Sequence, residues 1–175
     1  TVATQSYEIR KIIHAALVKS GTPETIEYKC VDFGFRGATC AQQAARGGAA
    51  HLLSFRSSDN IAGDRLARHV YGYADDSIAK SILATEHSIA TFFGSGQGEF
   101  EYYDWFLNVL EESGYVMGSV VIDSYDWENF IREVACHPEN IARVKALGEK
   151  GVKVIFRPDS GIPNEVLLKR LAIVG

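Results

Sequence analysis

The sequence predicts an α/β fold in which helices cover a parallel sheet. Helical and strand-like segments alternate along the 175 residues. The strand-like segments are largely apolar, as in residues 118–122 and 152–156, without a regular alternation of apolar and polar residues. Continuous apolar strands joined by helical crossovers are typical of a parallel sheet buried on both faces. Four or five such units predict an open α/β sheet or about half of a (β/α) barrel.

The first half of the chain is expected to begin with an amphipathic helix. Thr4 can cap it, Gly21 can end it, and one apolar stripe contains Ile9, Ile12, Ile13, Ala16 and Leu17. The segments that follow are, in order, a strand at 27–34, a helix at 38–48, a strand at 49–55 and a helix at 61–72.

The second half continues this alternation after a short strand near Ile82. Helix 98–114 has the clearest amphipathic pattern, with Tyr103 and Leu107 on one face and Gly114 at its end. The other expected elements are a helix at 85–94, a strand at 118–123, a helix from 127 to 134, a strand at 152–156 and a helix at 164–175.

Charged residues gather where these strands end. Every clear strand is followed by an aspartate, and most of the strand ends also carry an arginine; in order the residues are Asp32 with Arg36, Arg56 with Asp59, Asp123 alone, and Arg157 with Asp159. The residues 158–161, Pro-Asp-Ser-Gly, are also ordinary turn formers. However, parallel strands end on one face, which holds the active site in such folds. Arginine suits phosphate and aspartate suits hydroxyls or a water-bound metal, so the set predicts a phosphorylated sugar ligand.

Composition narrows the classes of partner. The net charge of −4 gives no footprint for nucleic acid or an anionic membrane. Apolar runs of roughly five residues are too short to span a bilayer. Cys30, Cys40 and Cys136 contain no C-x-x-C pair, which favours reduced thiols in a cytoplasmic protein over disulfides or zinc.

The chain starts without methionine and stops where a helix should end, so we expect an internal piece of a longer chain.

Several common catalytic motifs are incomplete. Asp32-Phe33-Gly34 lacks the other kinase motifs, and the glycine-rich segment 94–98 follows a helix instead of a strand. No Ser/His/Asp or Cys/His arrangement is evident, and four histidines are isolated and interpreted as structural or solvent-facing (His14, His51, His69 and His137). Spacing alone favours a structural role for His87 as well, although it lies at an expected helix start.

An ordered set of motifs resembles one enzyme family along the whole chain. The motifs are T-V-A-T, D-F-G-F-R-G, S-S-D-N-I-A-G, T-E-H-S, D-S-Y-D and R-P-D-S-G. They resemble the central portion of the type II nicotinate/nicotinamide phosphoribosyltransferase family. The resemblance implies an irregular (β/α) barrel and a homodimer. Family members condense nicotinamide with phosphoribosyl pyrophosphate to nicotinamide mononucleotide and pyrophosphate in NAD salvage. Residues 1–175 would then be one partial domain, about half of the barrel, without the N-terminal domain and the later strands.

The resemblance also implies roles in substrate binding. Phe33 would stack on the pyridine ring, and Asp59 would accept a hydrogen bond from the carboxamide nitrogen. Arg36 and Arg157 would face phosphate and the bound base.

The same resemblance implies a catalytic group and its cofactors. Asp123 and Asp159 would lie near the ribose hydroxyls and the pyrophosphate. Mg²⁺ would be held mainly by that pyrophosphate and by water, not by a protein metal site. His87 would be the histidine that ATP phosphorylates to drive the reaction.

Three alternatives remain open from the sequence. A nicotinate phosphoribosyltransferase has the same fold, but a carboxylate at Asp59 would repel the nicotinate carboxylate. The second alternative is an unrelated phosphate-binding barrel lyase or isomerase. A lysine at a strand end would favour this alternative, and the sequence shows none. The third is an inactive fragment, because half a barrel leaves strand edges open; residues 1–175 alone are therefore expected to lack transferase activity.

Overall fold

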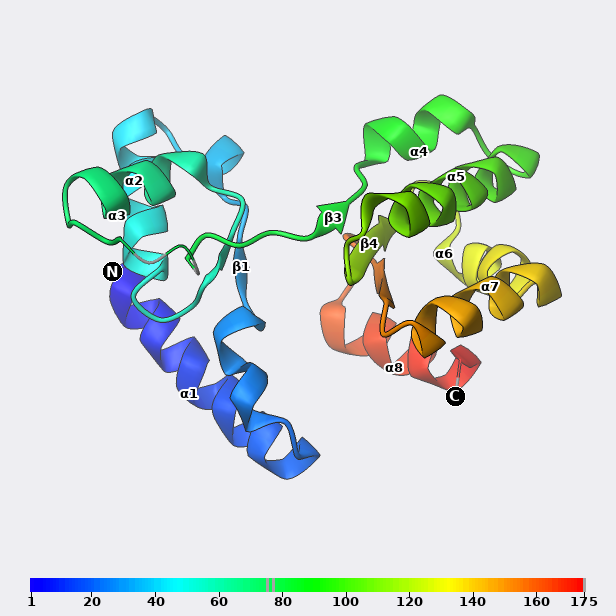
Figure 1. Cartoon of the computed structure of the whole chain (residues 1–175), viewed down its shortest axis with the longest axis horizontal. Coiled ribbons are helices and arrows are strands. Elements are labelled where there is room, and N and C mark those ends of the chain that lie inside the picture. The colour runs from blue at the N-terminus through cyan, green and yellow to red at the C-terminus, as the bar shows by residue number, and fades with distance from the viewer. Residues whose placement is uncertain (75, 77, 175) are drawn as a thin grey trace. The chain divides into compact units, whose positions relative to one another are not determined.

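The chain forms two compact units, Thr1–Ser81 and Ile82–Gly175, each with its own parallel sheet (Figure 1). This computed structural model describes residues 1–74, 76 and 78–174. The α/β class and the parallel pairing predicted from the sequence are confirmed. Among the described residues, no helix has the length and apolar character needed to cross a membrane.

The first unit consists mainly of helices around a two-stranded sheet. Its elements are α1 (Val2–Ser20), the 3-10 helix η1 (Pro23–Tyr28), β1 (Val31–Asp32), the 3-10 helix η2 (Phe35–Gly37), α2 (Ala41–His51), β2 (Ser57–Ser58) and α3 (Ile61–His69). β1 and β2 are parallel, with Val31 opposite Ser57 and Asp32 opposite Ser58. The carboxyl ends of both strands therefore lie at the same edge.

Two expectations for α1 are wrong. Thr1 occupies the N-cap position instead of Thr4, and it makes no side-chain capping bond. Ile9, on the expected apolar stripe, is exposed, and so is Ile12 beside it. The end of the helix is as predicted, since Gly21 adopts a left-handed conformation with φ of 88°.

The strand expected at 49–55 is also wrong, because this segment continues α2 and then turns. Alanine has the highest helix propensity, and the helix runs through Ala49 and Ala50 to His51. Leu52 and Phe55 are buried in the turn that follows. The strand expected at 27–34 shrinks to Val31–Asp32, because the proline at 23 starts η1 instead.

A close helix crossing holds α2 against α3. A Cβ atom added to Gly63 would lie 2.6 Å from the Cα atom of Gly48, which is shorter than a van der Waals contact. The two glycines therefore let the backbones of the helices touch. Ala49, Leu52 and Ala67 form the small apolar cluster beside them.

The second unit carries the three-stranded parallel sheet, in the order β3-β4-β5. Its elements are β3 (Leu83–Ala84), α4 (His87–Phe93), α5 (Gln97–Ser113), β4 (Met117–Val121), α6 (Trp127–Asn129), the π-helix η3 (Phe130–Ala135), α7 (Pro138–Glu149), β5 (Lys153–Arg157) and α8 (Pro163–Val174). The short strand expected near Ile82 and the strands at 118–123 and 152–156 are confirmed as β3, β4 and β5. The sequence reading did not anticipate α7, although Pro138 at its start is typical of a first helical turn.

The core of this unit lies between α5 and the sheet. Figure 1 shows α5 running beside β4. Tyr103, Leu107 and Leu110 are buried as the helical pattern predicted. They pack with Val120 and with Phe130 of η3. Burying such side chains stabilises a fold by about 1.5–3 kcal/mol each, so this core fixes β4 and the loop that follows it.

Candidate active site

Three of the predicted residues meet at the carboxyl end of the second unit's sheet. His87 begins α4 just beyond β3, Asp123 follows β4, and Asp159 follows β5. The His87 Nε2 atom lies 3.2 Å from Asp123 Oδ1, and its Nδ1 atom lies 3.9 Å from Asp159 Oδ2. The imidazole therefore stands between two carboxylates, an arrangement that the spacing of His87 in the sequence did not indicate.

Asp123 is held as a buried anion. Its side chain is 2% exposed, and its Oδ2 atom accepts hydrogen bonds from the Asp159 amide at 2.8 Å and from Ser160 Oγ at 2.6 Å. Burial by itself disfavours the charge. The hydrogen bonds from Ser160, Asp159 and His87 outweigh that burial, so the pKa of Asp123 lies below its usual value.

This anion determines which ring nitrogen of His87 carries a hydrogen. An ionised carboxylate can only accept, so the Nε2 atom of His87 carries a hydrogen toward Asp123. In the neutral imidazole the Nδ1 atom then has a free lone pair on the side of Asp159. The side chain of His87 is 39% exposed, which leaves it open to a reactant. The arrangement suits a nucleophile or a proton acceptor oriented by a carboxylate.

Arg157, the last residue of β5, is fixed against the loop that leads into His87. Its Nη2 atom donates to the Thr85 carbonyl at 2.8 Å and lies 3.7 Å from Glu86 Oε2. The side chain is 21% exposed. A guanidinium held in this way presents a fixed positive charge, as phosphate recognition requires.

The remaining predicted residues belong to the first unit. Phe33 and Asp59 directly follow β1 and β2, and the Asp59 amide donates to the Asp32 carbonyl at 2.8 Å, so both lie at the same strand edge. Their side chains are exposed, as is that of Arg36 in η2. The structure thus leaves all three accessible to a ligand, and their roles toward a base or phosphate stay predictions.

Arg56, the other arginine at a strand end, is already paired. Its Nε atom lies 2.7 Å from Glu27 Oε2, so its charge is partly compensated within the first unit. This pairing makes Arg56 a weaker candidate for phosphate than Arg157.

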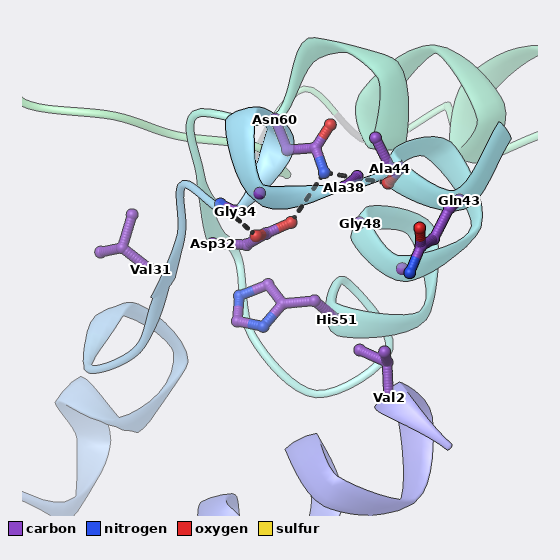
Figure 2. Close-up of a pocket in the computed structure, with 12 residues that line it drawn as sticks. Val2, Val31, Asp32, Gly34, Ala38, Gln43, Ala44, Gly48, His51 and Asn60 are labelled. Carbon is purple, nitrogen blue, oxygen red and sulfur yellow. Dashed lines mark hydrogen bonds between the residues drawn. The ribbon is translucent and has the colours of Figure 1, made fainter. Parts of the chain in front are cut away.

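Asn60 organises the strand ends of the first unit, and the sequence reading did not single it out. Its buried amide nitrogen donates to Asp32 Oδ2 and to the Ala44 carbonyl, each at 3.0 Å (Figure 2). Its Oδ1 atom accepts from the Gly63 amide and so caps α3. An asparagine directly before a helical pattern is a recognised capping signal, which could have indicated this role.

A cavity of about 380 Å³ opens beside Asp32 in the first unit (Figure 2). Gln43 and His51 supply further polar lining. The ring of His51 is buried, with Nε2 3.0 Å from the Ser57 carbonyl, and it stacks on Phe55. These contacts agree with the structural role predicted for His51.

The family model that matches this chain and the three relatives compared with it all carry phosphoribosyltransferase names. The model of the nicotinate phosphoribosyltransferase (NAPRTase) family matches residues 28–173. A protein of Xanthomonas campestris pv. campestris named nicotinamide phosphoribosyltransferase is 36% identical over 181 residues, covering 99% of this chain and 36% of the relative. Proteins of the same name from Acinetobacter baylyi and Mycoplasma genitalium are 31% and 30% identical, covering 95% and 92% of this chain and 33% and 31% of those relatives. The chain thus spans about a third of the length of these relatives.

Proposed function

The chain belongs to the nicotinate phosphoribosyltransferase family, and from this premise we propose that the protein is a nicotinamide phosphoribosyltransferase of NAD salvage. It condenses nicotinamide with phosphoribosyl pyrophosphate to give nicotinamide mononucleotide and pyrophosphate. The structural observation that carries the proposal is the imidazole of His87 between the carboxylates of Asp123 and Asp159. The names of the relatives support the choice of substrate.

The reaction needs electrostatic stabilisation more than a general base. The pyridine nitrogen of nicotinamide is already a nucleophile, so it forms the bond to the sugar carbon while the bond to pyrophosphate breaks. Positive charge builds on the sugar, and negative charge builds on the departing pyrophosphate. Carboxylates and a guanidinium held in advance stabilise these charges. Asp159 and Arg157, at the end of β5, are the groups we assign to this task.

The residues also fit a magnesium ion held by the substrate. Among the residues described, no group of three or more His, Cys, Asp or Glu side chains could hold a metal by itself. Mg²⁺ commonly keeps several waters and binds substrate phosphates with one or two carboxylates. Asp159, 38% exposed, is an accessible carboxylate of this cluster, and the ion would neutralise charge on the pyrophosphate.

We assign to His87 the coupling to ATP. The imidazole takes the terminal phosphoryl group of ATP, and ADP leaves. Asp123 orients the ring through Nε2, so Nδ1, on the side of Asp159, is the nitrogen with the free lone pair. The phosphorylated histidine assists the transfer but does not itself form the glycosidic bond.

The finer architecture belongs to the same proposal. We propose that the chain is part of an irregular (β/α) barrel, as the family resemblance implies, and that the protein is a homodimer in the cytoplasm. The free cysteines Cys30, Cys40 and Cys136 support a reducing compartment. Phe33 and Arg36 would contact the base and phosphate as the family resemblance implies.

Product analysis tests the proposed function. The full-length protein is incubated with phosphoribosyl pyrophosphate, Mg²⁺ and either nicotinamide or nicotinate, and the mononucleotide and pyrophosphate are quantified. We expect nicotinamide to be the better substrate, because Asp59 accepts an amide hydrogen and repels a carboxylate. Higher kcat/KM with nicotinate would favour the alternative activity, and no product with either base would refute both.

A further inference from the structure

A closed ring of hydrogen bonds surrounds the side chain of Thr85, the residue that follows β3. The Val121 amide donates to Thr85 Oγ1 at 2.9 Å, and Tyr102 OH donates to the Val121 carbonyl at 3.1 Å. The Thr85 and Tyr102 hydroxyl oxygens are 2.5 Å apart. Because the tyrosine hydrogen is used on Val121, the threonine hydrogen must point to the tyrosine oxygen. Each hydrogen in the ring then has one acceptor, as buried polar groups require.

This ring replaces a bond that the sheet would otherwise make. β3 and β4 pair in parallel with Ala84 opposite Ser119, and the Thr85 amide donates to the Ser119 carbonyl at 3.0 Å. In the regular parallel pattern, the next bond would join the Val121 amide to the Thr85 carbonyl. The Val121 amide instead bonds to the Thr85 hydroxyl, so the side chain of Thr85 substitutes for its own carbonyl.

The carbonyl released in this way holds Arg157. The Thr85 carbonyl accepts the hydrogen bond from Arg157 Nη2 at 2.8 Å. Thr85 thus joins β3, β4 and β5 at the point where the chain turns into α4 and His87. Hydrogen bonds from a charged guanidinium are stronger than neutral ones, so competition for this carbonyl has a measurable effect.

We propose that Thr85 and Tyr102 are positioning residues for Arg157: the hydroxyl ring satisfies the Val121 amide and leaves the Thr85 carbonyl free to orient the guanidinium. Both side chains are buried, so we assign neither of them a contact with substrate. The effect on activity rests on the proposed function, in which Arg157 faces a phosphorylated ligand. The structural part concerns only the bonds of Thr85 and is independent of the reaction.

The ring is expected to persist over the physiological pH range. Burial raises the pKa of Tyr102 to about 12, and the bonds to Thr85 and Val121 offset this only in part. The phenol therefore keeps the hydrogen that it donates to Val121. Protonation changes near neutral pH do not break the ring.

Three variants of the full-length protein test the positioning role. Thr85→Val removes the hydroxyl but keeps the shape, so the Val121 amide should bond to the carbonyl of residue 85 and displace Arg157. We expect KM for phosphoribosyl pyrophosphate to rise about tenfold, as for loss of one hydrogen bond to a charged group, with a smaller change in kcat. Thr85→Ser keeps the hydroxyl and should restore KM to within about twofold of the parent value. Tyr102→Phe removes the hydroxyl oxygen that accepts the Thr85 hydrogen, so it should also raise KM.

Tyr103→Phe is the matched control. Tyr103 is the next residue of α5 and is equally buried, but its hydroxyl has no hydrogen-bond partner among the described residues. The control should leave KM and kcat unchanged. An equal change in Tyr102→Phe and Tyr103→Phe would show a general packing effect and overturn the proposal.

A crystal structure of Thr85→Val decides the structural part without any assay. The proposal expects the Val121 amide within hydrogen-bond distance of the carbonyl of residue 85, with Arg157 moved away. Arg157 still bonded to that carbonyl, as in the parent, would overturn the proposal. If Thr85→Val does not fold, the same comparison is made with Tyr102→Phe, in which we expect the bond between Arg157 and the Thr85 carbonyl to be longer than in Tyr103→Phe. A parent protein that makes no nicotinamide mononucleotide would refute the proposed function and leave this structural comparison intact.

Discussion

The Nε2 atom of His87 lies 3.2 Å from Oδ1 of Asp123, an aspartate whose other carboxylate oxygen is already occupied by Ser160 and the Asp159 amide. The carboxylate is therefore a structural group of the turn after β5 as well as the partner of the imidazole. This double role makes its charge important for folding and for orientation of His87.

Asp123→Asn is expected to lower the free energy of unfolding by about 2 kcal/mol at pH 7, the size typical of lost charge-assisted hydrogen bonds. The pKa of Asp123 is lowered in the folded protein, so its charge stabilises the fold above the pKa of the unfolded chain, near 3.9. That stabilisation is lost as the pH falls through the folded pKa. Urea unfolding from pH 7 to about pH 2 should show the difference between parent and variant shrinking below about pH 4. The fully open Asp76, 98% exposed, provides the control Asp76→Asn, and a difference that does not shrink with pH would contradict the assignment.

His87→Ala should abolish ATP hydrolysis coupled to product formation. Some uncoupled synthesis should remain, because in the proposed function the phosphorylated histidine assists transfer without making the glycosidic bond. Incubation with ATP labelled at the terminal phosphate measures this directly, with the exposed His69 of α3 replaced by alanine as the control. Equal labelling of parent and His87→Ala would remove His87 from this role.

Asp59→Ser is expected to shift base preference from nicotinamide toward nicotinate. The substitution removes the carboxylate that, in the proposed function, accepts the amide hydrogen and repels an anionic base. The ratio of kcat/KM for the two bases should change by about tenfold or more, since a charge-assisted contact is worth roughly 1.5–3 kcal/mol. Steady-state kinetics with both bases measure it, beside Asp76→Ser. An unchanged ratio would place Asp59 outside the base pocket.

Gly63→Ala should destabilise the first unit strongly. The new Cβ would lie 2.6 Å from Gly48 Cα and 2.7 Å from its carbonyl carbon, and both are backbone atoms that cannot move aside. We expect a loss of about 2–3 kcal/mol, typical of overpacking. Gly47→Ala, whose Cβ would meet only Val2 Cγ2 at 3.9 Å, should instead be neutral or stabilising by up to about 1 kcal/mol, because alanine favours helix. Thermal unfolding of both variants checks this, and equal melting temperatures would contradict the close crossing.

The elements predicted best are those whose sequence pattern is long and unambiguous. Helix α5 repeats its apolar residues with helical spacing and ends at Gly114, which adopts the left-handed conformation with φ of 71°. Strands β4 and β5 are apolar segments next to clear turn residues. Strands β1 and β2 are each two residues long, too short for periodicity to reveal. The segment 49–55 was misassigned because a short apolar run does not distinguish a helix end from a strand.

The candidate site is predictable from the sequence only where its residues follow a recognisable local pattern. Aspartates after strands are visible in the sequence, which therefore predicts Asp123 and Asp159. His87 joins them through the register of three parallel strands, which no local pattern specifies. The role of Thr85 depends on a hydrogen bond between its side chain and β4. The sequence showed it only as an expected helix start.

The most direct test of the account is kcat/KM of Asp159→Asn for phosphoribosyl pyrophosphate in the full-length protein. The side chain of Asp159 is 38% exposed, and its backbone amide, which bonds to Asp123, remains in the variant, so folding should be little affected. We predict that the parent forms nicotinamide mononucleotide, and that the variant has kcat/KM lowered about 100-fold, as for loss of one preorganised electrostatic group, with a melting temperature within about 2 °C of the parent. A folded variant with the kcat/KM of the parent would contradict the assignment of the reaction to this cluster.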